Sequence, residues 1–489
     1  MNKIRVVIVG GGLAGLSTAE SLLREHADQF EVTVLEAKRS TGGRAGSFRD
    51  PSSGETIDYC QHVAMGCCTN LLGLLDRYGL SDSMQRYSEL RFLHPKHPQS
   101  HFAPIDWLPA PFHLAMTIGS LKYLTWAQHR SIRNGMLRLM RTNSDQLADK
   151  TAAKWLVDNG QDADTIRDFW DVILVSALGE STEFVSMSVA RKVLIDGFAA
   201  AKRASDVLVP TEPLGKLFGE HLTDAIRQLG ATIVPETSVT RVDADPIGVQ
   251  TKNGADAEGG ADSEGFLHAD HVVSAVPWHQ VCKLLADSKI RESVANLDAI
   301  GDFPSSPITG LHLWFDREIT DQPHHVLVGT TAQWIFRDPI ASPEPKPDDE
   351  SQSDSKRDGF YYQVVISASR EARAIPKDEL VQKVQRELRQ AFPATSAARL
   401  IRSQVVTDPQ SVFSVRPEVE AIRPPSHTSL PWFHLAGDWI ATGWPATMEG
   451  AVVSGILAAN SVKKETGLST IAIDPGLPRG WIAKQLIKS

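Results

Sequence analysis

Three glycines near the start of the chain have the spacing of a phosphate-binding turn. Gly10, Gly12 and Gly15 follow a run of β-branched residues and precede a helix-forming segment, and Leu13 and Ala14 lie within the same turn. In this arrangement the first glycine permits a tight turn, the second lets the backbone approach a pyrophosphate, and the third lets the helix pack on the strand. The pattern predicts a dinucleotide site at the N-terminus of a helix, where free N–H groups attract phosphate.

A carboxylate and an arginine loop follow at distances that suit the same ligand. Glu36, with Ala37 beside it, ends the second predicted strand at residues 31–35 and stands 21 positions after the last glycine. A carboxylate there would accept hydrogen bonds from a ribose. The next loop offers Gly43 and the fixed positive charge of Arg44 to a diphosphate. A solvent turn with a surface arginine is the alternative interpretation of this loop.

Two polar residues interrupt a mostly apolar run at residues 56–68. Burial of Gln61 and His62 would demand hydrogen-bond partners. Their spacing leaves two interpretations equally open: a position against a cofactor ring or the reacting end of a substrate, or a satisfied pair in the core. One histidine and three cysteines in this run could be mistaken for a metal site: Cys60, His62, Cys67 and Cys68. Their spacing fits no common zinc pattern, so no metal site is predicted.

A second group of candidate ligands lies near the C-terminal end. A buried strand is predicted to stop at Gly437 and Asp438, and a helix of small residues begins near Met448 and includes Ala451. Asp438 can accept hydrogen bonds from a sugar-alcohol chain. The N-terminus of the helix can face an anionic oxygen of the cofactor.

The bulk composition sets limits on the class of protein. The chain has 489 residues, 42% hydrophobic and 22% charged, which describes an ordinary globular protein of two or three domains. A net charge of −9 gives no indication of nucleic-acid binding. Four cysteines and the lack of a secretory leader predict a reducing, cytoplasmic setting. No apolar run reaches the roughly 18 residues of a spanning helix, so any contact with the inner face of the cell membrane is expected to be peripheral.

Two segments are candidates for such a contact. Residues 112–141 are predicted to be one long helical segment that is apolar and basic, as suits a surface of anionic lipid. A cap helix packed on its own domain is the alternative. The tail at residues 471–489, which contains Trp481 and several lysines, is a second candidate anchor.

Taken together, these motifs resemble the FAD-dependent amine oxidase and phytoene desaturase superfamily, from Ile4 to about Asn460. The resemblance implies an α/β fold, in which a Rossmann-like FAD-binding domain with a parallel sheet is interleaved with an α+β substrate domain that has a mixed sheet and a helical cap. It implies FAD as the cofactor, and no histidine or cysteine stands in an obvious attachment motif, so non-covalent binding is expected. The residues assigned to FAD are Gly10, Gly12, Leu13, Ala14, Gly15, Glu36, Ala37, Gly43, Arg44, Gln61, His62, Val239, Gly437, Asp438, Met448 and Ala451.

The same resemblance suggests a division into domains. Residues 1–105, 205–290 and 426–470 are assigned to the FAD-binding domain and residues 106–204 to the helical cap. Residues 291–425 are assigned to the sheet of the substrate domain, with a disordered loop at 342–358, and residues 471–489 to a C-terminal tail.

Within the superfamily, three stretches are most similar to the squalene-associated branch, hydroxysqualene dehydroxylase: residues 58–66, 170–178 and 435–451. The resemblance implies reduction of hydroxysqualene to squalene, with loss of the allylic hydroxyl, hydride transfer from reduced flavin N5 and His62 as the candidate acid. A long-chain isoprenoid, squalene-type synthases of the same pathway and an external electron donor would be the partners. The chain departs from that branch at residues 59–60, 178–179 and 408–413, which leaves the substrate open.

Three alternatives remain. A carotenoid (phytoene-type) desaturase or isomerase would work on a similar lipid in the opposite redox direction. A flavin amine oxidase is disfavoured, because Thr447 stands where those enzymes typically have a tyrosine, and residues 309–315 lack their usual lysine. The third alternative is not an enzyme: an FAD-binding scaffold protein without catalytic activity.

Overall fold

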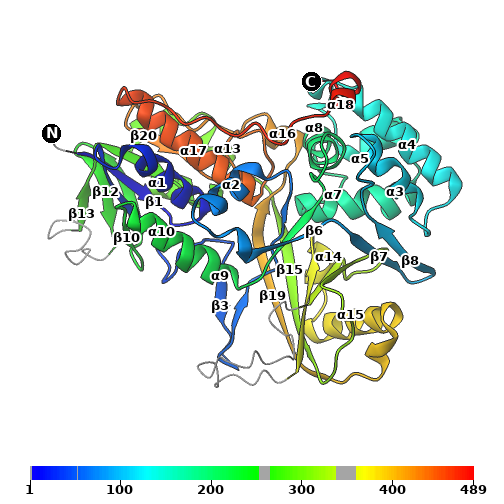
Figure 1. Ribbon diagram of the computed structural model, residues 1–489. Helices are drawn as coiled ribbons and strands as arrows, with labels where there is room; N and C mark the ends of the chain where they lie inside the picture. The colour runs from blue at the N-terminus through cyan, green and yellow to red at the C-terminus, as the bar shows by residue number, and fades with distance from the viewer. Residues whose placement is uncertain (1–2, 52, 253–264, 338–358, 489) are drawn as a thin grey trace.

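The computed structural model describes residues 3–51, 53–252, 265–337 and 359–488 (Figure 1). The loop predicted at residues 342–358 lies outside the described residues. Within them the fold is α/β, as predicted, and is built around two large sheets. Within the described ranges, no helix is long and apolar enough to cross a membrane.

The first large sheet is parallel and has five strands, in the order β10-β2-β1-β14-β20. Its bounds are β1 Ile4–Val9, β2 Phe30–Leu35, β10 Thr232–Val234, β14 His271–Ser274 and β20 Phe433–Leu435. β1 pairs in parallel with β2 on one side and with β14 on the other. The strand order therefore reverses at β1, with β2 on one side and β14 on the other, and ligands of such sheets bind outside the carboxyl ends of the strands at this switch point.

Two helices from opposite ends of the chain pack together beside this sheet. α1 (Leu13–His26) follows the glycine turn, and α17 (Met448–Glu465) follows β20. Figure 1 shows the blue α1 and the orange-red α17 side by side. Their close approach depends on Gly455, because a Cβ at this position would lie only 2.5 Å from the Ala14 carbonyl oxygen.

The second large sheet is mixed and has seven strands, in the order β19-β15-β18-β17-β16-β7-β8. Its bounds are β7 Leu90–His94, β8 His97–Phe102, β15 Ser305–Phe315, β16 His324–Leu327, β17 Trp334–Arg337, β18 Phe360–Ile366 and β19 Leu400–Phe413. Alternate residues of β15 and β18, such as Leu313 and Val364, form a core with α15 (Lys377–Ala391). The residues between them face the other way, toward the cap and the first sheet.

The cap differs from the prediction of one long helix at residues 112–141. A short turn at Phe112–Leu114 and α3 (Ala115–Gly119) are followed by a connector, and α4 (Trp126–Met140) begins afresh. The connector is held by burial of Leu121 and Tyr123, and a capping box between Thr125 and Gln128 starts α4. Buried tertiary contacts therefore break a segment whose local pattern is helical.

The remaining elements are short. The strands are β3 Ser47–Arg49, β4 Thr56–Asp58, β5 Ala64–Met65, β6 Met84–Tyr87, β9 Val207–Pro210, β11 Val239–Ala244, β12 Ile247–Thr251 and β13 Phe266–His268. The helices are α2 Thr69–Arg77, α5 Ala152–Asp158, α6 Ala163–Thr165, α7 Asp171–Leu178, α8 Met187–Leu194, α9 Leu214–Lys216, α10 Thr223–Gln228, α11 Trp278–Leu284, α12 Ser288–Ser293, α13 Leu297–Gly301, α14 Arg370–Arg373, α16 Pro417–Glu420 and α18 Trp481–Leu486.

The predicted domain boundaries remain a prediction, and two observations bear on them. β7 and β8 lie within the segment assigned to the FAD-binding domain, yet β7 pairs with β16 of the seven-stranded sheet. The C-terminal tail packs on the cap, where the backbone N–H of Lys488 donates to the carbonyl of Met140. Figure 1 shows the red α18 beside the cyan cap helices.

Candidate active site

A cavity of about 840 Å³ lies where the two sheets and the cap meet. Its lining includes residues that follow β1, β2, β14 and β20, which places it at the carboxyl ends of the parallel strands. Every residue assigned to FAD from the sequence lines this cavity except Gly15. The fold thus brings together candidates from both ends of the chain, although their roles as FAD ligands remain a prediction.

The glycine turn has the geometry that the sequence pattern requires. Gly10 has a φ of +112°, and a Cβ there would lie 2.8 Å from the Ala275 carbonyl oxygen on the neighbouring strand. A Cβ on Gly15 would lie 1.9 Å from the Gly10 carbonyl oxygen. Gly15 therefore lets α1 approach the turn and does not itself face the cavity, which explains its absence from the lining.

Glu36 organises the turn from the end of β2. One carboxylate oxygen accepts from the backbone N–H of Gly11 at 2.8 Å and the other from that of Lys38 at 2.8 Å. A carboxylate oxygen can accept more than one hydrogen bond, so the predicted contact with a ribose stays compatible with these bonds.

Arg44 and Asp438 meet directly in the cavity wall. Nη2 of Arg44 lies 2.5 Å from a carboxylate oxygen of Asp438, and Nη1 donates to the Ser411 carbonyl at 2.7 Å. The guanidinium carbon also lies 5.7 Å from the centre of the Trp278 ring. These contacts within the protein hold the guanidinium of Arg44 and the carboxylate of Asp438 in position.

The N-terminus of α17 forms the back of the cavity. The Thr447 hydroxyl accepts from the backbone N–H of Gly450 at 3.1 Å, so this threonine caps the helix. Glu449 is fully buried, and its carboxylate accepts from the backbone N–H groups of Asn70 at 3.0 Å and Leu71 at 2.8 Å. It thus ties α17 to the first turn of α2, a role that the sequence analysis did not assign.

Gln61 and His62 both line the cavity and do not form a closed pair in the core. The imidazole Nδ1 of His62 donates to the Cys60 carbonyl at 2.9 Å, which leaves Nε2 as the second ring nitrogen. Burial lowers the pKa of His62 below its ordinary value, and the positive charge of Arg44 lowers this pKa further. The neutral imidazole is therefore the favoured form near pH 7.

The part of the cavity beyond His62 is apolar and aromatic. The sequence analysis missed these residues, which come from the cap and from the seven-stranded sheet: Phe92, Phe102, Leu121, Tyr123, Phe169, Val172, Ile173, Phe198, Val326, Trp334, Phe336 and Val365. Strand periodicity could have placed Val365 on the face of β18 opposite to Val364. It could not have shown that this face meets the cap, because that contact joins segments far apart in sequence.

Among the residues that the structure describes, no group of three or more His, Cys, Asp or Glu side chains is arranged to hold a metal ion. Cys67 and Cys68 are buried in the cavity wall, and all four cysteines are free thiols.

A sequence model of the family described as flavin-containing amine oxidoreductase matches residues 13–463 of this chain. The chain belongs to this family. Its cofactor is FAD, and the cavity fits the group: a close-packed glycine turn, a fixed Arg44 and a capped helix terminus converge on one space. The residues present would hold FAD between the turn after β1 and the start of α17.

Phytoene desaturases and a hydroxysqualene dehydroxylase are among the similar relatives. A 15-cis-phytoene desaturase of an Oncidium hybrid is 26% identical over 493 residues, covering 94% of this chain and 78% of the relative. The 15-cis-phytoene desaturase of Synechococcus elongatus is 24% identical, and the match covers 94% of this chain and 96% of the relative. A hydroxysqualene dehydroxylase of Sinorhizobium fredii is 24% identical, and the match covers 94% of this chain and 99% of the relative.

Solved structures of the flavin oxidase fold are also similar. An oxidoreductase of Methanosarcina mazei superposes with a TM-score of 0.66 at 15% identity and covers 93% of this chain and 99% of its own. Cyclohexylamine oxidase of Brevibacterium oxydans superposes with a TM-score of 0.64 at 18% identity, and the match covers 95% of this chain and 100% of the oxidase. At these identities the likeness shows the fold alone. By its family the chain is a flavin-containing oxidoreductase, and by its structure it has the amine oxidase fold.

Proposed function

We propose that this FAD-dependent oxidoreductase reduces hydroxysqualene to squalene in the biosynthesis of isoprenoid lipids. The observation that carries the proposal is the shape and lining of the cavity, which runs from the glycine turn past His62 into an aromatic and aliphatic chamber. Such a chamber suits a long hydrocarbon, and Thr447 stands where a tyrosine would form one wall of an aromatic cage for an amine. The three stretches similar to hydroxysqualene dehydroxylases, and a relative of that name matched over its whole length, favour this substrate.

Each part of the cavity has a task in this proposal. Bound FAD, when reduced, supplies the hydride. The chamber formed by the cap and the sheet orients the isoprenoid chain and excludes water from the reacting carbon. His62 lies between the two parts, where Nε2 is free to hold a proton near the leaving hydroxyl. Burial disfavours the charged imidazole, so the neutral His62 carries no proton on Nε2. Another group of the protein must therefore deliver the proton to Nε2 before it passes to the substrate.

A phytoene-type desaturation is the second candidate, and the similarity to phytoene desaturases favours it. It uses the same cavity in the opposite redox direction, so that hydride moves from the lipid to the cofactor. Amine oxidation is less favoured, because Thr447 serves as the cap of α17 and β15 carries no lysine.

Peripheral contact with a lipid surface belongs to the same proposal, because the substrate does not cross water freely. We define the cap patch as Trp107, Phe112, Met116, Trp126 and Trp481, which are large apolar side chains exposed on the cap or on the C-terminal segment packed against it. Lys122, Arg130 and Lys484 are exposed in the same segments and suit anionic headgroups. The connector of the cap also contributes Leu121 and Tyr123 to the cavity wall, which connects the patch to the chamber.

The proposal is tested by anaerobic turnover of the purified, FAD-loaded enzyme. The flavin is reduced chemically, hydroxysqualene is added in detergent or vesicles, and squalene is measured together with reoxidation of the flavin. Formation of squalene in step with flavin oxidation is expected. No squalene from a fully loaded sample would overturn the proposal. Consumption of phytoene with a quinone acceptor in a parallel assay would establish the second candidate instead.

A further inference from the structure

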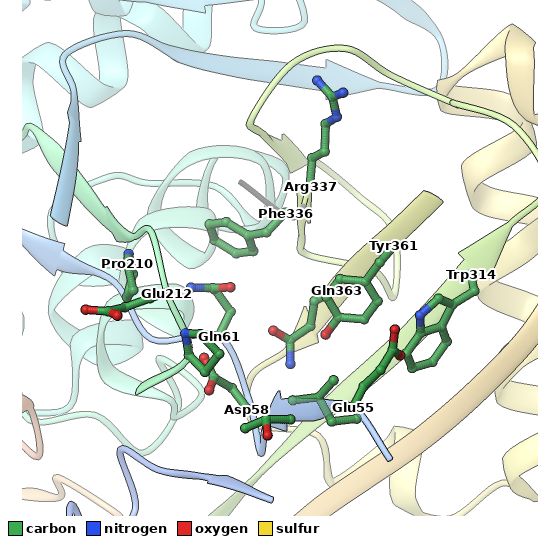
Figure 2. Close-up of a pocket in the computed structure, with 13 residues that line it drawn as sticks. Glu55, Asp58, Gln61, Pro210, Glu212, Trp314, Phe336, Arg337, Tyr361 and Gln363 are labelled. Atoms are coloured by element: carbon green, nitrogen blue, oxygen red, sulfur yellow. The ribbon is translucent and has the colours of Figure 1, made fainter. Parts of the chain in front are cut away.

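A second, smaller pocket adjoins the reaction cavity and is separated from it by two side chains. Gln61 and Phe336 line both spaces and therefore form the partition between them. Figure 2 shows the Gln61 amide beside the Phe336 ring. Thr56, an exposed residue of β4, lies in the wall of this pocket, which therefore reaches the surface.

The side pocket is more polar than the reaction cavity. Its wall includes carboxylates, an amide, a phenol and a guanidinium, from Glu55, Asp58, Glu212, Arg337, Tyr361 and Gln363. Its volume of about 50 Å³ is too small for a substrate. At about 10–15 Å³ for each water molecule, it has room for roughly three to five waters.

Gln363 indicates that water belongs there. Its side chain is buried, with 2% of its surface exposed, and its amide Nε2 has no hydrogen-bond partner among the described residues. A buried donor of this kind requires an acceptor, which an ordered water in the pocket would supply. Figure 2 shows Tyr361 and Gln363 on one side of the pocket and Asp58 and Gln61 on the other.

Asp58 can hold a proton at this position. One carboxylate oxygen accepts from the Ser47 hydroxyl at 2.5 Å and from the backbone N–H of Leu214 at 2.9 Å, which leaves the other oxygen without a bond in the described structure. Burial raises the pKa of Asp58 to about 6, against the opposing effect of these hydrogen bonds. Glu55, Glu212, Arg337 and Tyr361 are the other charged or titratable groups that face the pocket.

We infer that this side pocket is the route by which protons enter the reaction cavity and water leaves it, with Asp58 as the group that holds the proton. The inference rests on the proposed function. In that reaction the allylic C–O bond breaks with its electron pair, the oxygen takes up a proton and departs as water, and the carbon gains a hydride from reduced FAD. Each turnover thus consumes a proton and releases a water inside an apolar chamber. A desaturation releases no water and would leave this route without a task.

Asp58→Asn tests the inference, because asparagine keeps an oxygen that can accept from Ser47 and Leu214 but cannot carry the proton. In single turnovers of the reduced holoenzyme with hydroxysqualene, we expect the rate to fall at least about tenfold while FAD content is unchanged. Gln363→Leu is expected to slow turnover as well, since it removes the polar anchor of the water. Asp224→Asn, the same change at an exposed helix position, is the matched control and should turn over like the wild type.

A second measurement does not depend on turnover. The infrared band of a protonated carboxyl group should titrate near pH 6 in the wild-type holoenzyme and be missing from Asp58→Asn. If the variant keeps this band, or turns over at the wild-type rate, the inference is overturned while the proposed function stands. If the wild type forms no squalene, the proposed function fails and this inference fails with it.

Discussion

Arg44 and Asp438, which lie 394 positions apart in the sequence, form an ion pair of 2.5 Å in the wall of the reaction cavity. Arg44 comes from the loop after β2, and Asp438 comes directly after the last strand of the parallel sheet. Only 4% of the Asp438 side chain is exposed, so the pair is shielded from solvent on one side. It joins the two ends of the FAD-binding region and fixes a cation and an anion at the place where the cofactor is expected.

Loss of this pair should weaken FAD binding more than it weakens the fold. Asp438→Asn leaves the guanidinium of Arg44 without its charged partner and removes a charged acceptor for the cofactor. Hydrogen bonds to charged groups contribute about 1.5–3 kcal/mol, so we expect FAD to bind about 10- to 100-fold more weakly. Fluorescence titration of the deflavinated protein with FAD measures this change. Arg227→Ala, which breaks an exposed ion pair elsewhere, is the control and should bind FAD normally. Unchanged affinity in Asp438→Asn would remove Asp438 from the cofactor site.

His62 is expected to act on the substrate as the acid of the proposed reaction. His62→Ala should lower the single-turnover rate by about 100-fold or more, because a positioned acid contributes that much to the breaking of a C–O bond. The FAD content of the variant is measured in the same samples, because His62 is also one of the residues assigned to FAD. Stopped-flow absorbance of the flavin measures the rate. A variant that turns over as fast as the wild type would exclude His62 from the reaction.

The parts of the site that depend on local sequence could be predicted, and those that depend on tertiary contact could not. The glycine turn and the start of α17 follow from short-range rules on backbone conformation and capping, and the structure confirms both elements. The helix expected at residues 112–141 is wrong, because burial of Leu121 and Tyr123 outweighs the helical pattern there. The ion pair between Arg44 and Asp438 joins distant segments, and no spacing in the sequence indicates that partners so far apart will meet.

The cap patch should bind anionic lipid. Trp107, Trp126 and Trp481 have 78%, 75% and 69% of their surface exposed, which is unusual for tryptophan unless it meets a partner or a membrane interface. The C-terminal segment that carries Trp481 lies against the start of the cap, because a Cβ on Gly480 would be 3.9 Å from the Ala110 carbonyl oxygen. Burying each indole in the interface should strengthen binding by about tenfold.

Co-sedimentation with vesicles tests the cap patch. The double variant Trp107→Ser/Trp481→Ser should bind phosphatidylglycerol vesicles about 100-fold more weakly than the wild type. Val157→Ser, at an exposed apolar position of α5 outside the patch, is the control and should bind like the wild type. Wild-type binding should also be weaker to phosphatidylcholine vesicles, which lack the negative charge. If the double variant sediments with the vesicles as well as the wild type does, the patch is not the lipid contact.

Buried histidines should make the protein sensitive to mild acid. His324 is 1% exposed and packs edge-on against Tyr87 and close to Trp334, with ring centres 5.0 and 6.1 Å away. Neither ring nitrogen has a hydrogen-bond partner among the described residues. Burial, with a smaller effect from the charge of Arg91, lowers the pKa of His324 from its ordinary value of 6.5 to about 4. The unfolded chain therefore binds a proton between these two pH values and the folded chain does not. The stability from His324 is complete above pH 6.5 and is lost as the pH falls toward 4.

Replacing this histidine should remove its part of the acid sensitivity. His324→Phe keeps an aromatic ring in the aromatic surroundings and has no proton to gain. Between pH 7.5 and pH 5, the free energy of unfolding of the wild type should fall by about 1–2 kcal/mol more than that of the variant. Urea denaturation followed by tryptophan fluorescence at both pH values measures the difference. His268→Phe, at an exposed position of β13, should keep the wild-type dependence on pH. Equal losses in the wild type and in His324→Phe would show that His324 has the same pKa in the folded and the unfolded chain, and this would contradict the effect of its burial.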